Sequence, residues 1–314
     1  MDNSFKSKMI KFLLLNLLLF NVLFTAVGQL SQSTKNSLAT INSERVEYAP
    51  SISANGNTMI FQSDRSGNYN LYVTHKSDGN TWSIPEPIKG QINDYGSEND
   101  LIGGPSLSYD GNYLYFFASF KGGFGAEDIY YSVRENNEWS APKNIGKPIN
   151  TTAYEGFPTI SSDGKSLYFM KISGNSVEQM TCYTMMVSNR DENGNWEKPY
   201  PLPNNINKGC EKFPRIMSDN ETLIFSSIRG GDTKNGFDLF ETKYLGEQKW
   251  SEPVSMDFAN TESHDYFGAV SSVADVIYTN AVPKTYSANY DLYSSKIPTE
   301  FKPRSVINII RGDN

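Results

Sequence analysis

The chain has 314 residues and a net charge of −7, with 28 Lys and Arg against 35 Asp and Glu. Nucleic acids and anionic lipid surfaces are held by basic side chains, so this acidic balance argues against both as main partners. An aromatic content of 13% suits the half-buried strands of an all-β protein, and the length suits one domain.

The N-terminus carries a secretion pattern. Lys6, Lys8 and Lys11 precede an apolar run over 12–27, which ends at a small-residue site at Gly28. We predict a secretory signal peptide over 1–28, followed by a flexible segment over 29–40. The alternative is a retained anchor, although this run is shorter than the roughly 20 residues that a spanning helix needs. After cleavage no transmembrane segment is expected.

An internal repeat organises the rest of the chain. The four tryptophans are 57, 57 and 54 residues apart, each in a W-[SE]-x-P phrase: Trp82, Trp139, Trp196 and Trp250. A second phrase of the type P-x-I-S-x-D-G begins at Pro50, Pro105, Pro158 and Pro214. Its Asn-Gly or Asp-Gly pair is a hairpin signal, because both turn residues need positive φ. A recurring unit of this size predicts a repeat architecture.

Each unit reads as four antiparallel strands, a to d. Strand a ends at the hairpin pair, strand b follows it, strand c begins at a D-[IL]-[YF] phrase, and strand d carries the Trp and Pro. Because proline cannot donate to a ladder, strand d is expected at the outer edge. This pattern predicts a β-propeller, whereas a two-sheet sandwich would not require the recurring phrase.

The copies predict an all-β propeller of four-stranded antiparallel blades over 41–307, with five blades or, as the alternative, six. The fifth copy is decayed, and Phe301 stands in it where tryptophan is expected. No strand from either terminus is evident as the one that closes the ring. A short tail over 308–314 follows.

The sequence phase sorts side chains between the two faces of the ring. The start of a, the end of b, the start of c and the end of d all lie on one face, which we call the long-loop face. It should carry Cys182 and Cys210, which are expected either to form a disulfide or to remain as buried thiols.

The same face should gather a ring of charges. Carboxylates precede strand a and basic groups follow strand b, and the candidate residues for binding a ligand or partner are Glu47, Arg65, Lys121, Glu155, Lys171, Glu211, Arg229, His264 and Asp265. One interpretation is ion pairs that join neighbouring blades around the channel mouth. The other is a grip on a polar ligand or a partner's peptide.

Catalytic and cofactor signals are few. With His75 and His264 as the only histidines, no His-rich metal site is predicted, and H-E-x-x-H, C-x-x-C and G-x-S-x-G patterns are absent. We therefore predict no catalytic residue, metal or cofactor. The alternative is a glycosidase-type carboxylate pair across the channel mouth.

Together the phrases P-x-[IL]-S-x-D-G, D-[IL]-[YF] and W-S-x-P resemble the TolB-like, WD-repeat-like propeller repeats of Gram-negative cell-envelope proteins. The resemblance covers about residues 41–307. It implies a periplasmic, surface or secreted propeller that acts as a protein-interaction platform.

The sequence thus predicts an exported, non-enzymatic propeller that binds an envelope protein or an extended ligand through its long-loop face. The alternative is a glycan hydrolase or carbohydrate-binding protein that uses channel-mouth carboxylates. The oligomeric state, the partner's identity and the side of the outer membrane stay open.

Overall fold

The computed structural model describes residues 36–77, 81–172, 183–208, 210–229, 236–282 and 290–302. The predicted signal peptide and C-terminal tail lie outside these residues. Within this part of the chain, no helix is long and apolar enough to cross a membrane.

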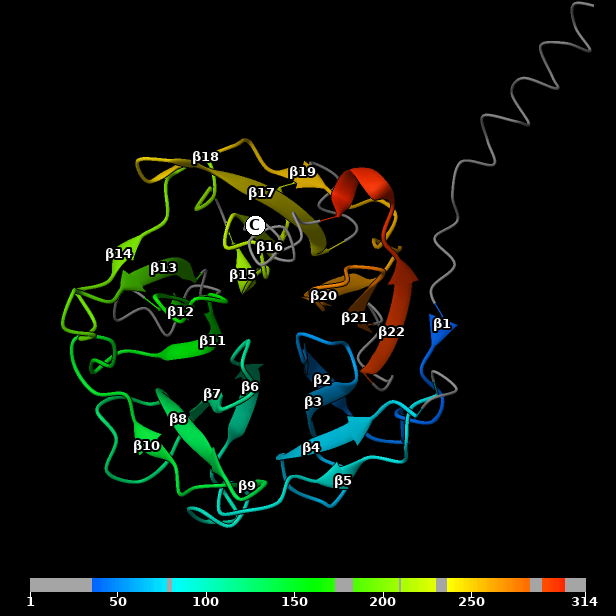
Figure 1. The fold of residues 1–314 in the computed structure, drawn as a ribbon, viewed down its shortest axis with the longest axis vertical. Helices are drawn as coiled ribbons and strands as arrows, with labels where there is room; N and C mark the ends of the chain where they lie inside the picture. Colours follow the sequence, from blue (N-terminus) through cyan, green and yellow to red (C-terminus); the bar gives the residue numbers. More distant parts are fainter. Residues whose placement is uncertain are drawn as a thin grey trace, which may run out of the picture. The chain divides into compact units, whose positions relative to one another are not determined.

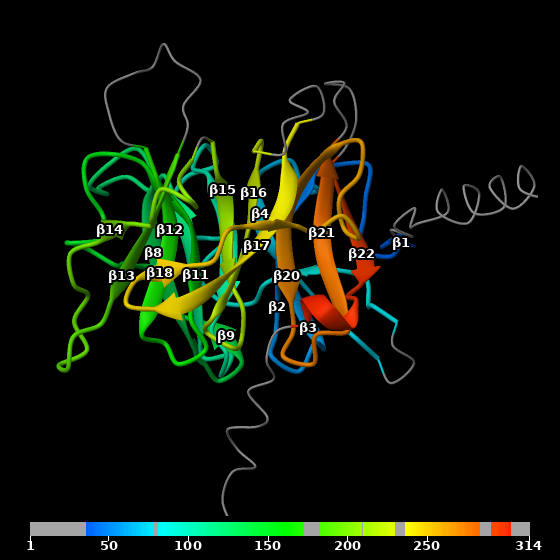
Figure 2. The same cartoon turned by 90° about the horizontal axis from the view of Figure 1, so that it is seen from above.

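Five antiparallel sheets surround a common axis, so the prediction of a five-bladed all-β propeller is confirmed (Figure 1). The strands run between the two faces of the ring (Figure 2). From the innermost strand outward, blade 1 holds β2 (Glu47–Ile52), β3 (Thr58–Ser63), β4 (Asn70–His75) and β5 (Glu86–Pro87); blade 2 holds β6 (Ile102–Leu107), β7 (Tyr113–Ala118), β8 (Asp128–Glu135) and β10 (Lys143–Asn144); blade 3 holds β11 (Glu155–Ile160), β12 (Ser166–Lys171), β13 (Thr184–Asn189) and β14 (Tyr200–Pro201); blade 4 holds β15 (Lys212–Ile216), β16 (Thr222–Ser227), β17 (Asp238–Gly246) and β19 (Val254–Ser255); blade 5 holds β20 (His264–Val270), β21 (Val276–Val282), β22 (Asp291–Lys296) and β1 (Asn36–Ser37).

The N-terminal strand closes the ring. Asn36 and Ser37 of β1 pair antiparallel with Ser294 and Tyr293 of β22, so the outer strand of the last blade comes from the start of the chain. These two residues lie within the segment expected to be flexible, and the propeller therefore begins before residue 41. The expectation that Phe301 opens the outer strand is wrong, because Thr299–Phe301 is a short 3-10 helix, η1.

The proline of each W-[SE]-x-P phrase divides the fourth strand into two pieces. Trp139 in β9 (Glu138–Trp139) and Trp250 in β18 (Lys249–Trp250) pair with the end of the third strand of their own blade. The outer strand then begins directly after the proline, at Lys143 in blade 2 and Val254 in blade 4. Since proline has no N–H to donate, the ladder is interrupted at that point.

Each innermost strand contains a β-bulge. The register of the first strand against the second shifts once in every blade. The bulged residues all have left-handed backbone, with φ between 50° and 58°: Ala49, Gly104, Phe157, Phe213 and Phe267. The phenyl rings of Phe157, Phe213 and Phe267, from three different blades, lie 4.2–5.6 Å apart between centroids. The bulges thus fill the axis with aromatic side chains.

The apolar core lies between blades. Separate buried clusters join each neighbouring pair, such as Ile60 of blade 1 with Phe116 and Trp139 of blade 2. Blade 5 packs on blade 1 in the same way, through Tyr278 and Trp82. Burial between sheets supplies most of the favourable free energy of such a fold.

Candidate functional site

The first strand of each blade positions the predicted carboxylates. Glu47, Glu155 and Asp265 lie in the first or second residue of β2, β11 and β20, and Glu211 directly precedes β15. All four side chains are at most 1% exposed. A buried carboxylate is costly unless it is paired and hydrogen-bonded, so their partners decide their role.

Three of these carboxylates form ion pairs within their own blade. Glu47 lies 2.9 Å from the Arg65 guanidinium, Glu155 lies 2.9 Å from the Lys171 ammonium, and Glu211 lies 2.9 Å from the Arg229 guanidinium. The basic residue stands at or just after the end of the second strand, next to the start of the first strand. The interpretation of these charges as ion pairs between neighbouring blades is therefore wrong, because each pair lies within one blade.

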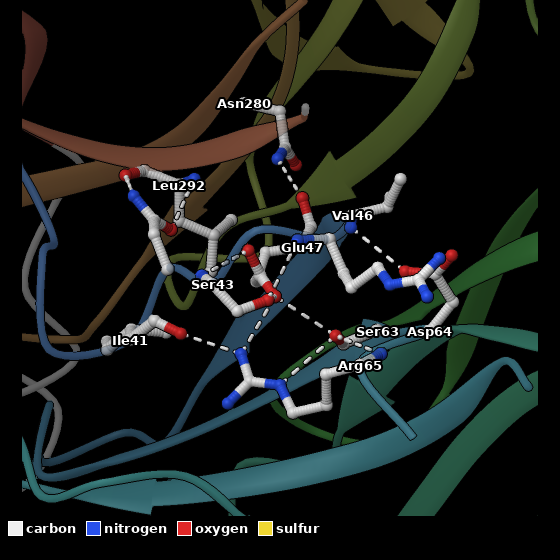
Figure 3. Close-up of polar contacts among 11 residues, drawn as sticks. Ile41, Ser43, Val46, Glu47, Ser63, Asp64, Arg65, Asn280 and Leu292 are labelled. Atoms are coloured by element: carbon white, nitrogen blue, oxygen red, sulfur yellow. Dashed lines mark hydrogen bonds and ion pairs between the residues drawn. The ribbon is translucent and has the colours of Figure 1, made fainter. Parts of the chain in front are cut away.

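The chain segment that enters each blade completes these pairs. Glu47 accepts hydrogen bonds from the backbone N–H and hydroxyl of Ser43, and Arg65 donates to the carbonyl oxygen of Ile41 (Figure 3). In blade 3, Thr151 donates to Glu155 through its N–H and hydroxyl. We call each arrangement of carboxylate, base and entering segment a linker clasp.

Blade 4 repeats the clasp with some differences. Arg229 donates to the carbonyl oxygens of Asn205 and Ile206 in the segment that arrives from blade 3. It also donates to Glu211, which accepts a further hydrogen bond from Ser227. The clasp therefore ties one blade to the linker from the blade before it, which is a structural role.

Blade 2 departs from the pattern, whereas blade 5 repeats the contact with the entering segment. In blade 2, Ile102 occupies the position of the carboxylate, and Lys121 is exposed. In blade 5, Asp265 accepts hydrogen bonds from the N–H and hydroxyl of Thr261, as Glu155 does from Thr151. Of the nine candidate residues, Lys121 is thus the one whose side chain is open to solvent.

His264 belongs to an aromatic cluster near the centre of the long-loop face. Its ring is stacked on Tyr266 at 5.9 Å, and its Nδ1 accepts a hydrogen bond from the N–H of Phe237. The Lys212 ammonium lies 4.5 Å from the centroid of the Phe237 ring, and burial lowers the pKa of Lys212. This cluster offers cation–π and stacking surfaces rather than an acid–base pair.

Arg215 crosses the axis below the phenylalanine rings, and sequence reasoning missed it. From blade 4, its guanidinium donates to the carbonyl oxygens of Pro158, Pro105 and Pro50 in blades 3, 2 and 1, at 3.2, 3.1 and 3.4 Å. Its Cζ lies 5.6 Å from the centroid of Phe267 in blade 5. Burial lowers the pKa of Arg215 to about 10. One side chain therefore contacts all four other blades and occupies the channel.

The signal that could have revealed Arg215 is a departure from the repeat. The phrases P-S-I-S, P-S-L-S and P-T-I-S have Ser or Thr after the proline, and the fourth copy has P-R-I-M. The equivalent Ser51, Ser106 and Thr159 are small and buried. Their size leaves room at the axis for one long side chain.

Cys210 is disulfide-bonded. Cys182, the other cysteine of the chain, lies outside the described residues. Among the residues that the structure describes, no group of three or more His, Cys, Asp or Glu side chains could hold a metal ion. Asp128, one of the D-[IL]-[YF] aspartates, instead accepts hydrogen bonds from the N–H groups of Phe124 and Gly125.

No protein-family model and no curated protein matches the chain. Solved structures do match its fold. They include a glycoside hydrolase at 10% sequence identity and a TM-score of 0.59, covering 81% of this chain and 88% of that one. The GH43 endo-arabinanase from Bacillus licheniformis matches at 15% identity and a TM-score of 0.53, over 82% and 96% of the two chains.

A putative TolB from Agrobacterium tumefaciens matches at 16% identity and a TM-score of 0.48, over 79% of this chain and 74% of that one. These likenesses show the fold alone. They leave both the envelope role and the hydrolase role as hypotheses about this chain.

Proposed function

We propose that this protein is an exported, non-enzymatic propeller that holds an envelope protein or an extended ligand on its long-loop face. The observation that carries the proposal is the linker clasp. Glu47, Glu155 and Glu211, three carboxylates at the start of the innermost strands, are each paired with a cation of their own blade. A rigid ring that presents variable loops is a common basis for recognition.

The axis supports the same conclusion. A glycosidase needs two carboxyl groups roughly 5–10 Å apart around a space that admits the sugar. Here the axis holds the rings of Phe157, Phe213 and Phe267, with Arg215 beneath them. These side chains leave little room for a saccharide at the channel centre.

Exposed aromatic residues mark where a partner would be held. Tyr69 is 37% exposed, Tyr95 42% and Phe124 43%, and all three lie in loops of the long-loop face in blades 1 and 2. The exposed Lys121 belongs to the same loop as Phe124. Aromatic residues dominate binding energy at protein interfaces, so blades 1 and 2 are the favoured docking region.

The second candidate function is a glycan hydrolase, the activity named for one solved protein of similar fold. It requires a pair of carboxylates that is free to act on a sugar. The two functions therefore differ in whether purified protein releases reducing sugar.

The first experiment incubates the purified protein with arabinan, xylan and peptidoglycan and measures reducing ends. We expect no release above that of heat-denatured protein. Release that persists through repurification would establish the hydrolase instead.

The second experiment places a photo-crosslinking phenylalanine analogue at position 124 in intact cells. The matched control is the same analogue at position 273, since Val273 is 53% exposed in a hairpin turn of the opposite face. We expect one reproducible protein adduct from position 124 and none from position 273. Equal adducts from both positions would contradict a docking region on blades 1 and 2. Sequencing of the exported form should begin at Gln29, and an uncleaved N-terminus would contradict the signal peptide.

A further inference from the structure

An aromatic groove opens between blades 2 and 3 on the face opposite the long loops. We call it the interblade groove, and its volume is about 700 Å³. Hairpin-turn residues from both blades line it, together with Tyr113, Tyr115, Tyr131, Arg190 and Trp196. Small-molecule sites have volumes of roughly 300–1,000 Å³ and combine apolar walls with a few polar groups.

The groove exists because one blade contact differs from the others. Trp82 and Trp250 pack edge-on against Tyr278 and Tyr168 of the preceding blade, and both indoles are 8% exposed. Trp196, which occupies the same place in blade 3, is only half-buried. The interface between blades 2 and 3 is therefore less tightly closed around its tryptophan.

Arg190 takes part in this opening. Its Cζ lies 4.0 Å from the centroid of Trp196, which covers one face of the indole. It also donates to the carbonyl oxygens of Gly164 and Gly194, in the two turns beside the groove. These contacts fix the guanidinium and the indole plane, so the wall is preorganised before any ligand arrives.

The opposite wall is a ladder of tyrosines. The rings of Tyr113, Tyr115 and Tyr131 lie 6.2–6.3 Å apart between centroids, and Tyr113 is 39% exposed. Tyr113 and the half-buried Tyr131 offer flat apolar surfaces and hydroxyl groups, and the buried Tyr115 supports them from behind. Asp110 and Asp163 line the groove as well, so carboxylates balance its cations.

A second hollow lies next to the interblade groove, between blades 3 and 4. Its volume is about 420 Å³, it shares Ser161 and Asp163 with the interblade groove, and Tyr200, Tyr244 and Trp250 line it. The two hollows together form one track of aromatic rings along blades 2, 3 and 4. A track of this kind suits a chain-like ligand rather than a compact one.

We propose that the interblade groove binds a neutral oligosaccharide. The flat C–H faces of sugar rings suit the tyrosine and tryptophan surfaces, and sugar hydroxyls suit carboxylate, guanidinium and phenol groups. Because acidic and basic groups both line the groove, it does not select for a charged chain. The site needs neither channel carboxylates nor hydrolysis.

The test titrates the intact protein with cellohexaose, xylohexaose, mannohexaose and arabinohexaose and follows tryptophan fluorescence. We expect at least one of them to give a saturable change, because Trp196 is the most accessible of the four indoles. Tyr113→Ala should weaken that binding at least tenfold. Tyr69→Ala is the matched control, since Tyr69 is 37% exposed on the other face, and it should bind as the wild type does.

Circular dichroism of each variant shows whether the fold is intact. Binding that is equal in Tyr113→Ala and Tyr69→Ala overturns the proposal, as does the absence of saturable binding to all four sugars. Preference for a proline-rich peptide over these sugars overturns it as well. None of these results affects the crosslinking at position 124, so the two proposals fail separately.

Discussion

Asn42 and Leu292, 250 residues apart in the chain, are joined by two hydrogen bonds. The Asn42 side-chain Nδ2 donates to the Leu292 backbone carbonyl oxygen, and the Leu292 N–H donates to the Asn42 side-chain Oδ1, both at 2.9 Å. The same reciprocal pair recurs in each of the other blades, where the asparagine after the outer strand holds the third strand: Asn93 with Leu71, Asn150 with Ile129, Asn207 with Met185, and Asn260 with Leu239. In blade 5 this interaction fastens the ring.

Asn42→Ala should loosen the closure. Loss of two hydrogen bonds to backbone groups should lower the free energy of unfolding by about 2 kcal/mol. Asn93→Ala removes the same bonds within a continuous blade and serves as the control. We expect hydrogen exchange at Leu292 and its β22 neighbours to accelerate in Asn42→Ala only. Equal rates of amide hydrogen exchange in β22 of both variants would show that Asn42 does not stabilise the closure of blade 5.

Arg215→Met should destabilise the protein despite replacing a buried charge with an apolar side chain. The change leaves the carbonyl oxygens of Pro50, Pro105 and Pro158 without their donor, at a cost of about 3 kcal/mol. Urea denaturation of wild type, Arg215→Met and Arg215→Lys measures it. A variant as stable as the wild type would mean that these bonds do not stabilise the ring.

The bulge positions allow a matched pair of backbone tests. Ala49→Gly relieves a left-handed alanine and should change stability by less than about 1 kcal/mol. Gly104→Ala places a Cβ 2.9 Å from Phe117 and Phe157, so it should cost more than about 1 kcal/mol. Thermal unfolding of the two variants gives the comparison. A stable Gly104→Ala would argue that the axis is loosely packed.

Glu241 provides a pH test. Its side chain is 9% exposed, its Oε2 lacks a hydrogen-bond partner within the described part of the chain, and burial raises its pKa above the ordinary 4.5. Because the folded state holds the proton more tightly than the unfolded state, this group lowers stability as the pH rises above about 4.5. We expect Glu241→Gln to be more stable than the wild type at pH 7 and equal to it at pH 4. A gain of the same size at both pH values would contradict the assignment to ionisation.

The period of the repeat was enough to predict the blades, because the hairpin pair and the proline of the outer strand stand at similar positions within each copy. The closing strand was not evident, since Asn36 and Ser37 carry no tryptophan or proline phrase. The signal that was present lies just after them. Ile41-Asn42 repeats the pairs that follow the other outer strands, and its role becomes visible only when Asn42 meets Leu292.

The sequence predicted on which face of the ring the charged residues lie, but not which residues pair with one another. Residues at the start of strand a and the end of strand b do lie together, as the meander requires. Which basic residue pairs with which carboxylate depends on the register of the first two strands of a blade. Glu155 of β11 stands directly opposite Lys171 of β12, and the position within the repeat does not give that register. Arg215 was missed because its function depends on carbonyl oxygens of three other blades, and no sequence pattern encodes backbone acceptors.

The linker clasp is the centre of this account, and a double-mutant cycle on Glu211 and Arg229 tests it most directly. Unfolding free energies are measured for wild type, Glu211→Gln, Arg229→Met and the double variant. We expect each single change to cost about 3 kcal/mol and the coupling energy to be about 2 kcal/mol, because each leaves the other group buried without its partner. Single variants as stable as the wild type, with a coupling energy near zero, would contradict this account. They would mean that the ion pair does not stabilise the fold and that the carboxylate could serve in binding or catalysis.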